Sequence, residues 1–446
     1  MTVVTPDITI VGLGPGDPGQ RTIAVQRALD SAARIFVRTH PDVDLSDLVE
    51  HEHVTDVASL RQPDTELGGR WQVANDAVCD AAADGPVVLA IPGHPRFGEG
   101  LVVGTLNEAA RRGLSTRVLD GISVVDLMAT TLGIDPLLQD AQFFNAREFG
   151  TEDDPQSPFM GGMFTGSPLR PMLLTHVYDQ AVMAGVARAL ARVLPHDHSV
   201  IRIVAAGMPD EEISHHTVGE LPIVPSGPLV ALWVPAQGDL EAGRDPRTLQ
   251  HIVARLRRPD GCPWDREQTH ESLRDNIVDE AYEVMDAIDA GDPVNLVEEL
   301  GDLFLLICMH AQIAEENGTF TLEDVYQGIS SKIIRRHPHV FGDAVANEAS
   351  DLAEIWAGVK AQEKADNPLR AVKGIDGQPH SMPALVRAPK VLRKYPLTTD
   401  MPPSTQDDRS RELLRAVAAI IMAGDDPEHV LRDALAEHVT GNATPP

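Results

Sequence analysis

The sequence predicts a multidomain protein in which an N-terminal α/β domain is followed by an all-α helical bundle domain. At 446 residues, the chain is longer than one ordinary domain. Short apolar runs alternate with amphipathic stretches in its first half, whereas apolar residues recur at helical spacing in its second half. We therefore expect an α/β domain at 1–236, a linker at 237–246, a helical domain at 247–395 and a polar tail at 396–446.

Composition narrows the function classes. The formal net charge of −30 disfavours nonspecific binding to DNA, RNA or anionic lipid, because polyanions would be repelled. A nucleotide substrate remains open, since a divalent metal can hold its phosphates. No apolar run reaches the roughly 18 residues of a membrane span, and the N-terminus has no secretory pattern. The three cysteines lack metal-like spacing, which suits a reducing cytoplasm. We expect a cytoplasmic protein that binds neither nucleic acid nor membrane.

The first half alternates strand, turn and helix, which predicts a largely parallel sheet. The expected strands are 8–13, 87–91, 172–175, 200–206 and 228–235, and the expected helices are 22–33, 101–112 and 179–194. In the second half, the expected helices are 247–257, 273–290, 295–317, 322–336, 409–424 and 428–438. The sequence Gly291-Asp292-Pro293 separates the second of these from the third, which is typical of a helical hairpin.

An acidic constellation is the strongest chemical signal. Glu280 and Glu283 are three residues apart and share one helix face, and Glu299 and Asp302 do the same. The hairpin should bring the two pairs opposite each other, where buried and ionised carboxylates would repel. A divalent cation relieves that repulsion, and oxygen ligands favour Mg²⁺ or Mn²⁺.

A solvated acidic face is the alternative interpretation of these carboxylates, because acids on helices are usually exposed. Apolar neighbours favour the metal site, since acids that border a core-facing stripe need a partner. These neighbours are Ile277, Ala281, Val284, Leu300, Leu303 and Phe304.

Several motifs in the second half of the chain resemble those of a known family. The stretch 249–364 resembles the MazG-type nucleotide pyrophosphohydrolases, an all-α family in which an E-E-x-x-E helix and an E-x-x-D helix bind Mg²⁺. The matching segments are the acidic helices, Gly-Cys-Pro-Trp-Asp-x-x-Gln-Thr at 261–269, Lys-x-x-Arg-Arg-His-Pro-His-Val-Phe at 332–341 and Trp-x-x-x-Lys at 356–360. Asp279 stands where the family has its first Glu.

The resemblance implies hydrolysis of standard or damaged nucleoside triphosphates to a nucleoside monophosphate and pyrophosphate. It makes Glu280, Glu283, Glu299 and Asp302 the metal ligands and catalytic residues. The implied substrate-binding residues are Asp279, Glu298, Lys332, Arg335, Arg336, Trp356 and Lys360. The alternative interpretation of Lys332, Arg335 and Arg336 is a basic helix end that complements the helix dipole. The alternative interpretation of Trp356 is an ordinary buried side chain. The family also implies a homodimer or a higher homo-oligomer.

A glycine-containing loop opens the first half. Gly12-Leu13-Gly14-Pro15-Gly16 follows an expected strand, but Pro15 removes a backbone donor, so this is not a dinucleotide fingerprint. With segments 92–98 and 121–123, the loop resembles the tetrapyrrole (corrin/porphyrin) methylases, which bind S-adenosylmethionine between two α/β subdomains. The resemblance covers 7–236 and implies cofactor contacts from Gly12, Gly14, Pro15, Gly16, Gly93, His94 and Ser123. Tight turns alone would also explain the glycines.

The whole architecture is similar to the bacterial YabN-like fusion proteins. His94 replaces the usual Asp of the methylases, as it does in those fusions, so the resemblance supports ligand binding more than methyl transfer. The tail faintly resembles the end of a second MazG unit, with Asp408 and Arg411 at ligand positions, where an arginine would repel a cation. Alternatives to hydrolysis are an S-adenosylmethionine-dependent methyltransferase or an S-adenosylmethionine-sensing regulatory protein with an accessory helical domain.

Overall fold

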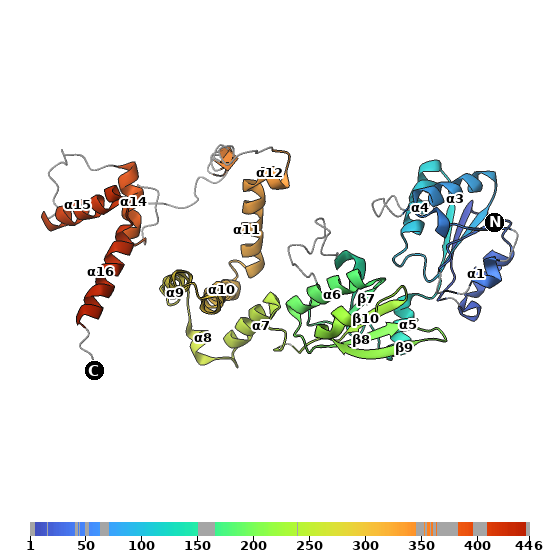
Figure 1. The fold of residues 1–446 in the computed structure, drawn as a ribbon, viewed down its shortest axis with the longest axis horizontal. Helices are drawn as coiled ribbons and strands as arrows, with labels where there is room; N and C mark the ends of the chain where they lie inside the picture. Colours follow the sequence, from blue (N-terminus) through green and yellow to red (C-terminus); the bar gives the residue numbers. More distant parts are fainter. Residues whose placement is uncertain are drawn as a thin grey trace. The chain divides into compact units, whose positions relative to one another are not determined.

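The computed structural model describes most of the chain in two compact units, Met1–Leu322 and Glu323–Pro446. The first contains two β-sheets and the first helices of the helical half, and the second is helical (Figure 1). The described residues are 5–15, 17–40, 43, 45–49, 53–62, 71–149, 166–238, 240–344, 352, 355–356, 358–359, 363, 382–395 and 408–442. The predicted fold class, α/β followed by all-α, is confirmed.

The first sheet is entirely parallel. Its strands are β1 (Ile8–Gly12), β2 (Ile35–Val37), β3 (Val54–Asp56), β4 (Val87–Ile91) and β5 (Thr116–Leu119), in the order β3-β2-β4-β1-β5. All five positions of β4 are buried, as expected for a strand covered on both faces. Alternate side chains of β1 enter different cores: Ile8 and Ile10 pack in one, and Val11 packs in the other.

Helices cover both faces of this sheet. Helices α3 (Gln72–Asp84) and α4 (Gly100–Arg112) belong to the core of Ile8 and Ile10, whereas α1 (Ile23–Asp30) belongs to the opposite core. This two-sided covering is what a parallel sheet requires, because its crossover connections place helices on both faces.

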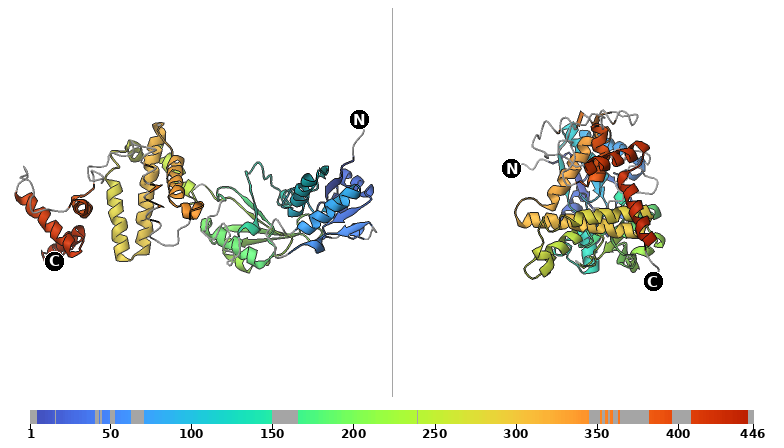
Figure 2. Two further views of the ribbon diagram at one scale, coloured as in Figure 1. Left: turned by 90° about the horizontal axis from the view of Figure 1, so that it is seen from above. Right: turned by 90° about the vertical axis from the view of Figure 1, so that its left-hand side faces the viewer.

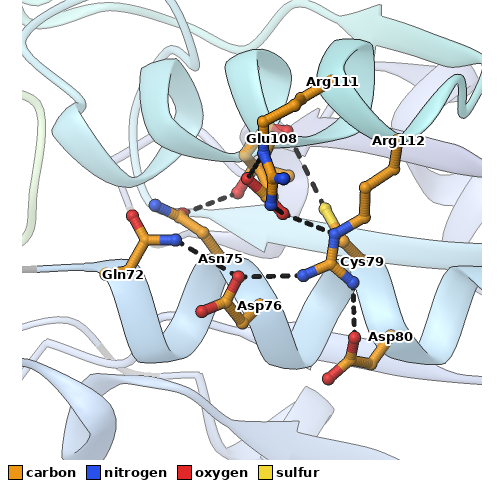
Figure 3. Close-up of polar contacts among 9 residues, drawn as sticks. Gln72, Asn75, Asp76, Cys79, Asp80, Glu108, Arg111 and Arg112 are labelled. Carbon is orange, nitrogen blue, oxygen red and sulfur yellow. Dashed lines mark hydrogen bonds and ion pairs between the residues drawn. The ribbon is translucent and has the colours of Figure 1, made fainter.

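An ion-pair network joins α3 to α4 (Figure 3). The Glu108 side chain is only 8% exposed and accepts hydrogen bonds from the guanidinium groups of Arg111 and Arg112. Arg112 also pairs with Asp76 and Asp80 on α3. Hydrogen bonds from the two arginines lower the pKa of Glu108 to about 2, so this carboxylate stays ionised at neutral pH. The link between the two helices is made by Arg112 with Asp76 and Asp80.

The second sheet differs from the expectation. Its strands are β6 (Gln142–Asn145), β7 (Met172–Thr175), β8 (Ser199–Val204), β9 (Glu212–Thr217) and β10 (Val230–Val234), in the order β6-β7-β10-β8-β9. Only β6 and β7 pair in parallel, and the other pairings are antiparallel. The prediction of a largely parallel sheet is therefore wrong here. Short connections such as the one between β8 and β9 allow antiparallel pairing without a crossover helix.

Two helices cover the second sheet on its two faces. Helix α6 (Gln180–Val193) packs in one core with β7 and β10, and α5 (Val124–Leu132) packs against Leu173, Ile203 and Trp233 in the other. Ser123 caps α5 reciprocally with Asp126, because each side chain bonds the other residue's backbone N–H.

The helical half opens with α7 (Pro246–Arg257), α8 (Pro263–Glu267), α9 (Asn276–Ala290) and α10 (Pro293–Glu316). Helix α9 ends at Gly291, whose φ of 65° is left-handed. Asp292 then caps α10, and Pro293 is its first residue. Figure 2 shows α9 and α10 side by side. The predicted helical hairpin is confirmed.

The second unit contains most of α11 (Leu322–Arg336), followed by α12 (Pro338–Phe341), α14 (Ala384–Lys394), α15 (Asp408–Ala423) and α16 (Pro427–Asn442). The last three of these helices contact one another. Helix α14 was not expected, because Pro389 interrupts its sequence pattern. Among the described residues, no helix has both the length and the apolar character that a membrane span requires.

Candidate functional site

The α9–α10 hairpin brings acidic side chains together. Glu280 and Glu283 project from α9, and Glu299 projects from α10. One carboxylate oxygen from each of these three residues lies within 4.8 Å of the other two. The one-turn spacing on α9 and the tight turn at Gly291 together produce this convergence.

Burial makes this cluster unusual. Glu299 is only 7% exposed, and its buried Oε2 atom has no hydrogen-bond partner among the residues that the structure describes. A buried carboxylate oxygen without a partner destabilises the fold. Burial raises the pKa of Glu299, and repulsion from Glu283 and Asp302 adds to the shift. The pKa of Glu280 is raised by burial and by the charges of Glu283, Asp302 and Asp279. The charge of Asp302 therefore acts on Glu280 and Glu299, but Asp302 is exposed and its carboxylate is not one of the three that converge within 4.8 Å.

The donor set fits a hard divalent cation. Carboxylate oxygens within a few ångströms of one another are the ligands that Mg²⁺ and Mn²⁺ prefer. A cation would also give the unpartnered Oε2 of Glu299 a ligand contact and remove the mutual repulsion. The residues present therefore fit such an ion.

The apolar neighbours of the acids are only partly covered. Val284, Leu303 and Phe304 are half-buried, as expected for a core-facing stripe. Ile277 and Leu300 are 38% and 48% exposed, and Ala281 is also exposed, so the expectation is wrong for these three. The hairpin buries one apolar face against α7, and its other face has exposed apolar side chains that no described residue covers.

Two further predicted substrate residues flank the acids. Asp279 and Glu298 are exposed, and each adjoins a ligand candidate along its helix. The charge of Asp279 contributes to the raised pKa of Glu280, and the charge of Glu298 contributes to that of Glu299. Both side chains therefore add negative charge to the rim of the cluster.

The predicted basic residues lie at the end of α11, in the second unit. Lys332 is half-buried, and Arg335 and Arg336 lie in the last turn. Both arginines bind the carboxylate of Glu363, each with one contact of 2.6 Å. The sequence analysis did not single out Glu363. No short sequence motif marks Glu363, because its role depends on contacts with residues 27 and 28 positions away in the sequence.

The predicted aromatic residue of this region is half-covered. Trp356 is 39% exposed and packs edge-to-face on His337, with 6.2 Å between the ring centroids. An exposed indole face of this kind can stack on a nucleobase. Lys360 lies outside the described residues.

In the first half, the predicted cofactor loop borders a cavity of about 180 Å³. Gly14, Pro15, Gly93 and His94 line it. Gly14 and Gly93 also exchange two backbone hydrogen bonds, of 3.2 and 2.6 Å, at the carboxyl ends of β1 and β4. The loop therefore lies at the edge of the sheet where α/β proteins bind ligands.

Gly12 and Ser123, which were also predicted to contact the cofactor, do not line this cavity. A Cβ added to Gly12 would lie 2.6 Å from the backbone nitrogen of Gly121, so Gly12 allows close backbone packing. Ser123 is used as the cap of α5. Gly16 lies outside the described residues.

Sequence reasoning missed several residues that line the cavity. His176 has a left-handed φ of 65° directly after β7, and burial, with the charges of Arg147 and Arg38, lowers its pKa to about 4. Arg38 follows β2 and pairs with Glu99. Tyr178 lines both this cavity and an adjoining cleft of about 1160 Å³. Because β2 was not predicted, the position of Arg38 at a strand end was not recognised.

Comparisons with known proteins agree with this architecture. Residues 7–222 match the family model of the Tetrapyrrole (Corrin/Porphyrin) Methylases. Residues 268–341 match that of the MazG nucleotide pyrophosphohydrolase domain. Both matches lie inside the predicted domains 1–236 and 247–395, whose bounds stay predictions. The cobalt precorrin-4 methyltransferase CbiF covers 52% of this chain and 98% of its own, with 16% identity and a TM-score of 0.40.

Two relatives match different lengths of the chain. The protein YabN of Bacillus subtilis (strain 168) is 33% identical over 391 residues, which is 86% of this chain and 76% of YabN. The nucleoside triphosphate pyrophosphohydrolase/pyrophosphatase MazG of Thermotoga maritima is 48% identical over 124 residues, or 28% of this chain and 47% of that protein. This chain therefore spans about half the length of that MazG relative. It belongs to the YabN-like family, and in this chain the match to the tetrapyrrole methylases precedes the match to the MazG nucleotide pyrophosphohydrolase domain.

Proposed function

We propose that this chain hydrolyses standard or damaged nucleoside triphosphates to a nucleoside monophosphate and pyrophosphate in the cytoplasm. The carboxylates of Glu280, Glu283, Glu299 and Asp302 hold Mg²⁺ for this reaction, and Mn²⁺ can replace it. One observation carries the proposal: three carboxylates converge within 4.8 Å, and a buried oxygen among them has no partner. The MazG family match at 268–341, which contains all four acids, supports it.

In this mechanism, water adds across the bond between the α-phosphorus and its bridging oxygen, and pyrophosphate leaves. When bound, Mg²⁺ would neutralise charge on the phosphates and would make the attacking water more acidic. Glu280 is our candidate to accept the proton of the attacking water, because a carboxylate has two oxygens and one of them can stay free of the metal. Glu283 and Glu299 lie opposite each other on the hairpin, and their carboxylates would hold the metal in place.

The remaining predicted residues bind the nucleotide. We assign the triphosphate to Lys332, Arg335 and Arg336, because guanidinium groups bind phosphate oxygens in a bidentate manner. Trp356 stacks on the base with its half-exposed ring. Lys360 completes this group, and Asp279 and Glu298 orient the substrate from the rim of the acidic cluster.

The first prediction concerns the proposed base and ligand. Glu280→Ala removes one carboxylate from the cluster and should lower Mg²⁺-dependent pyrophosphate release by at least about 100-fold, the usual minimum for loss of a general base. Asp286→Ala, an exposed acid on the same helix, is the matched control and should keep wild-type activity. The measurement is pyrophosphate release from a panel of nucleoside triphosphates with and without Mg²⁺. Equal rates for wild type and Glu280→Ala would refute the site.

We also propose that the chain forms a homodimer or a higher homo-oligomer through α9 and α10. Large apolar side chains on these helices remain exposed in the single chain, and an apolar patch of this kind is typical of an interface. They are Ile277, Val278, Met285, Ile288, Val294, Val297, Leu300 and Ile307. A second copy that covers them would also exclude water from the neighbouring acids.

The second prediction tests this interface. Ile288 is 57% exposed on α9, and Ile288→Asp should convert the oligomer to a monomer, because an interface cannot bury an unpaired charge without a large penalty. Light scattering after size-exclusion chromatography measures the mass. Ile223→Asp changes a residue that is 84% exposed in the α/β half and should leave the mass unchanged. A monomeric wild type, or an Ile288→Asp protein of unchanged mass, would contradict the interface.

A second candidate function belongs to the first half, which we propose binds S-adenosylmethionine. The cavity combines the bare backbone of Gly14 and Gly93 with the apolar side chains of Leu127, Met128 and Val230. A Cβ added to Gly93 would meet no atom within 4 Å, so open space adjoins this backbone. Such a lining fits an adenosine group. S-adenosylmethionine would supply a methyl group when bound, but His94 in place of the methylase Asp favours binding over transfer.

The third prediction tests that cavity. Leu127→Trp fills the space between the loop and α5, and should weaken S-adenosylmethionine binding by at least about tenfold, because the ligand and the indole compete for one volume. Leu138→Trp alters a side chain that is 85% exposed and serves as the control. Calorimetric titration of each protein measures the affinity. Absence of binding by wild type, or equal binding by Leu127→Trp, would rule out this use of the cavity.

A further inference from the structure

Arg335 and Arg336 are adjacent in sequence, yet they share one anion. Successive residues on a helix point about 100° apart, so neighbouring side chains do not normally converge. Here the Nε and Nη2 atoms of both guanidinium groups reach the Glu363 carboxylate, at 3.1 and 2.6 Å for each arginine. Their place in the last turn of α11 gives both side chains the freedom to do so.

Glu363 is the most enclosed member of this cluster. Its side chain is 9% exposed, compared with 27% for Arg336 and 46% for Arg335. Hydrogen bonds from Arg336 and Arg335 lower the pKa of Glu363 to about 2, so it remains ionised. Among the described residues of this cluster, two guanidinium groups share one carboxylate, and the arginines are its more exposed members.

The arginines keep donors for a further ligand. Glu363 bonds two nitrogen atoms of each guanidinium, which leaves both Nη1 groups. Within the described part of the chain, neither arginine has a second carboxylate at ion-pair distance. The more exposed side of the cluster therefore keeps N–H groups of both guanidinium groups, and guanidinium N–H groups bind phosphate oxygens.

We propose that Glu363 is a positioning residue, which holds Arg335 and Arg336 together as a clamp for the polyphosphate of the nucleotide. This inference rests on the proposed pyrophosphohydrolase function for its substrate. Without Glu363, the two cations repel each other and their long side chains separate. With it, one side of each guanidinium is fixed, and the other side is ready to bind phosphate without further ordering.

The opposite role for Glu363 is that of an internal competitor, which occupies the phosphate position and leaves when substrate arrives. Its burial argues against this role, because a competitor must reach solvent while the more exposed arginines stay in place. The two roles predict opposite changes in affinity when the charge is removed. The competitor role therefore becomes one outcome of the test.

The fourth prediction uses the full-length chain. Glu363→Gln keeps the size of the side chain but removes the charge that gathers the arginines. It should raise the KM for a nucleoside triphosphate, and the Kd of inorganic pyrophosphate, by roughly tenfold, because charge-assisted bonds depend on the fixed arginines. The kcat should change less than twofold, since ground-state and transition-state binding weaken together. Glu363→Asp retains the charge and should restore much of the affinity.

A matched control exists in the same chain. Glu108 also gathers two adjacent arginines, is similarly enclosed and has a pKa of about 2, but it lies in the α3–α4 network (Figure 3). Glu108→Gln should lower the Tm without changing KM or pyrophosphate affinity. It reproduces the structural effect of removing such a carboxylate and separates that effect from phosphate binding.

The outcomes distinguish this inference from the proposed function. Unchanged KM and pyrophosphate affinity in Glu363→Gln, with or without a lower Tm, would overturn the positioning role. Tighter pyrophosphate binding would identify Glu363 as a competitor and also overturn it. Direct calorimetric titration with pyrophosphate requires no turnover. Two results together would therefore support the clamp and refute the proposed function: Glu363→Gln binds pyrophosphate more weakly than wild type, and wild type hydrolyses no triphosphate.

Discussion

Mutual repulsion among carboxylates on the α9–α10 hairpin is the constraint on which the functional half of this protein depends. Glu299 is almost fully buried, with acids around it, and one of its oxygens has no partner. The hairpin holds these groups together through backbone features at its turn. The left-handed Gly291 ends α9, and Asp292 caps α10 immediately afterwards. The fold therefore tolerates an unfavourable arrangement that a divalent cation would relieve.

Local signals made this hairpin and its acids predictable. Glu280 and Glu283 are one turn apart, and Gly291-Asp292-Pro293 specifies both the end of one helix and the start of the next. Such features depend only on nearby residues, and sequence is most informative about them. The central strands of the first sheet were predicted for the same reason, because apolar runs between turn residues are local patterns.

Features that depend on distant contacts were missed. The antiparallel second sheet follows from the pairing of β10 with β7 and β8, and strand composition alone does not encode that pairing. Glu363 lies 27 and 28 residues from the arginines that it binds. His176 became notable only when folding placed it in a cavity with a positive φ. In each case tertiary structure determines the role, and no short sequence motif marks it.

The same arrangement of charged side chains occurs at two places in the chain. A carboxylate gathers two neighbouring arginines at Glu108 and again at Glu363, and in both cases hydrogen bonds lower the carboxyl pKa to about 2. At Glu108, acids from a second helix pair with Arg112, so the positive charge of this group is balanced within the fold. At Glu363 the arginines keep exposed donors. In a chain with a net charge of −30, such cationic positions are where an anionic ligand can bind.

The central claim is that the acidic cluster destabilises the metal-free fold and that a metal relieves this strain. Because the pKa of Glu299 is raised, the folded state binds its proton more tightly than the unfolded chain does. Its penalty therefore begins as pH rises above the ordinary glutamate pKa of about 4.3 and is complete above the raised value. Thermal unfolding of wild type and Glu299→Gln across this pH range, in chelator and in Mg²⁺, tests this directly. We predict that the variant is more stable than wild type in chelator at neutral pH, that the difference disappears near pH 4, and that Mg²⁺ stabilises only wild type. A variant less stable than wild type in chelator at neutral pH, or equal stabilisation of both proteins by Mg²⁺, would contradict the account.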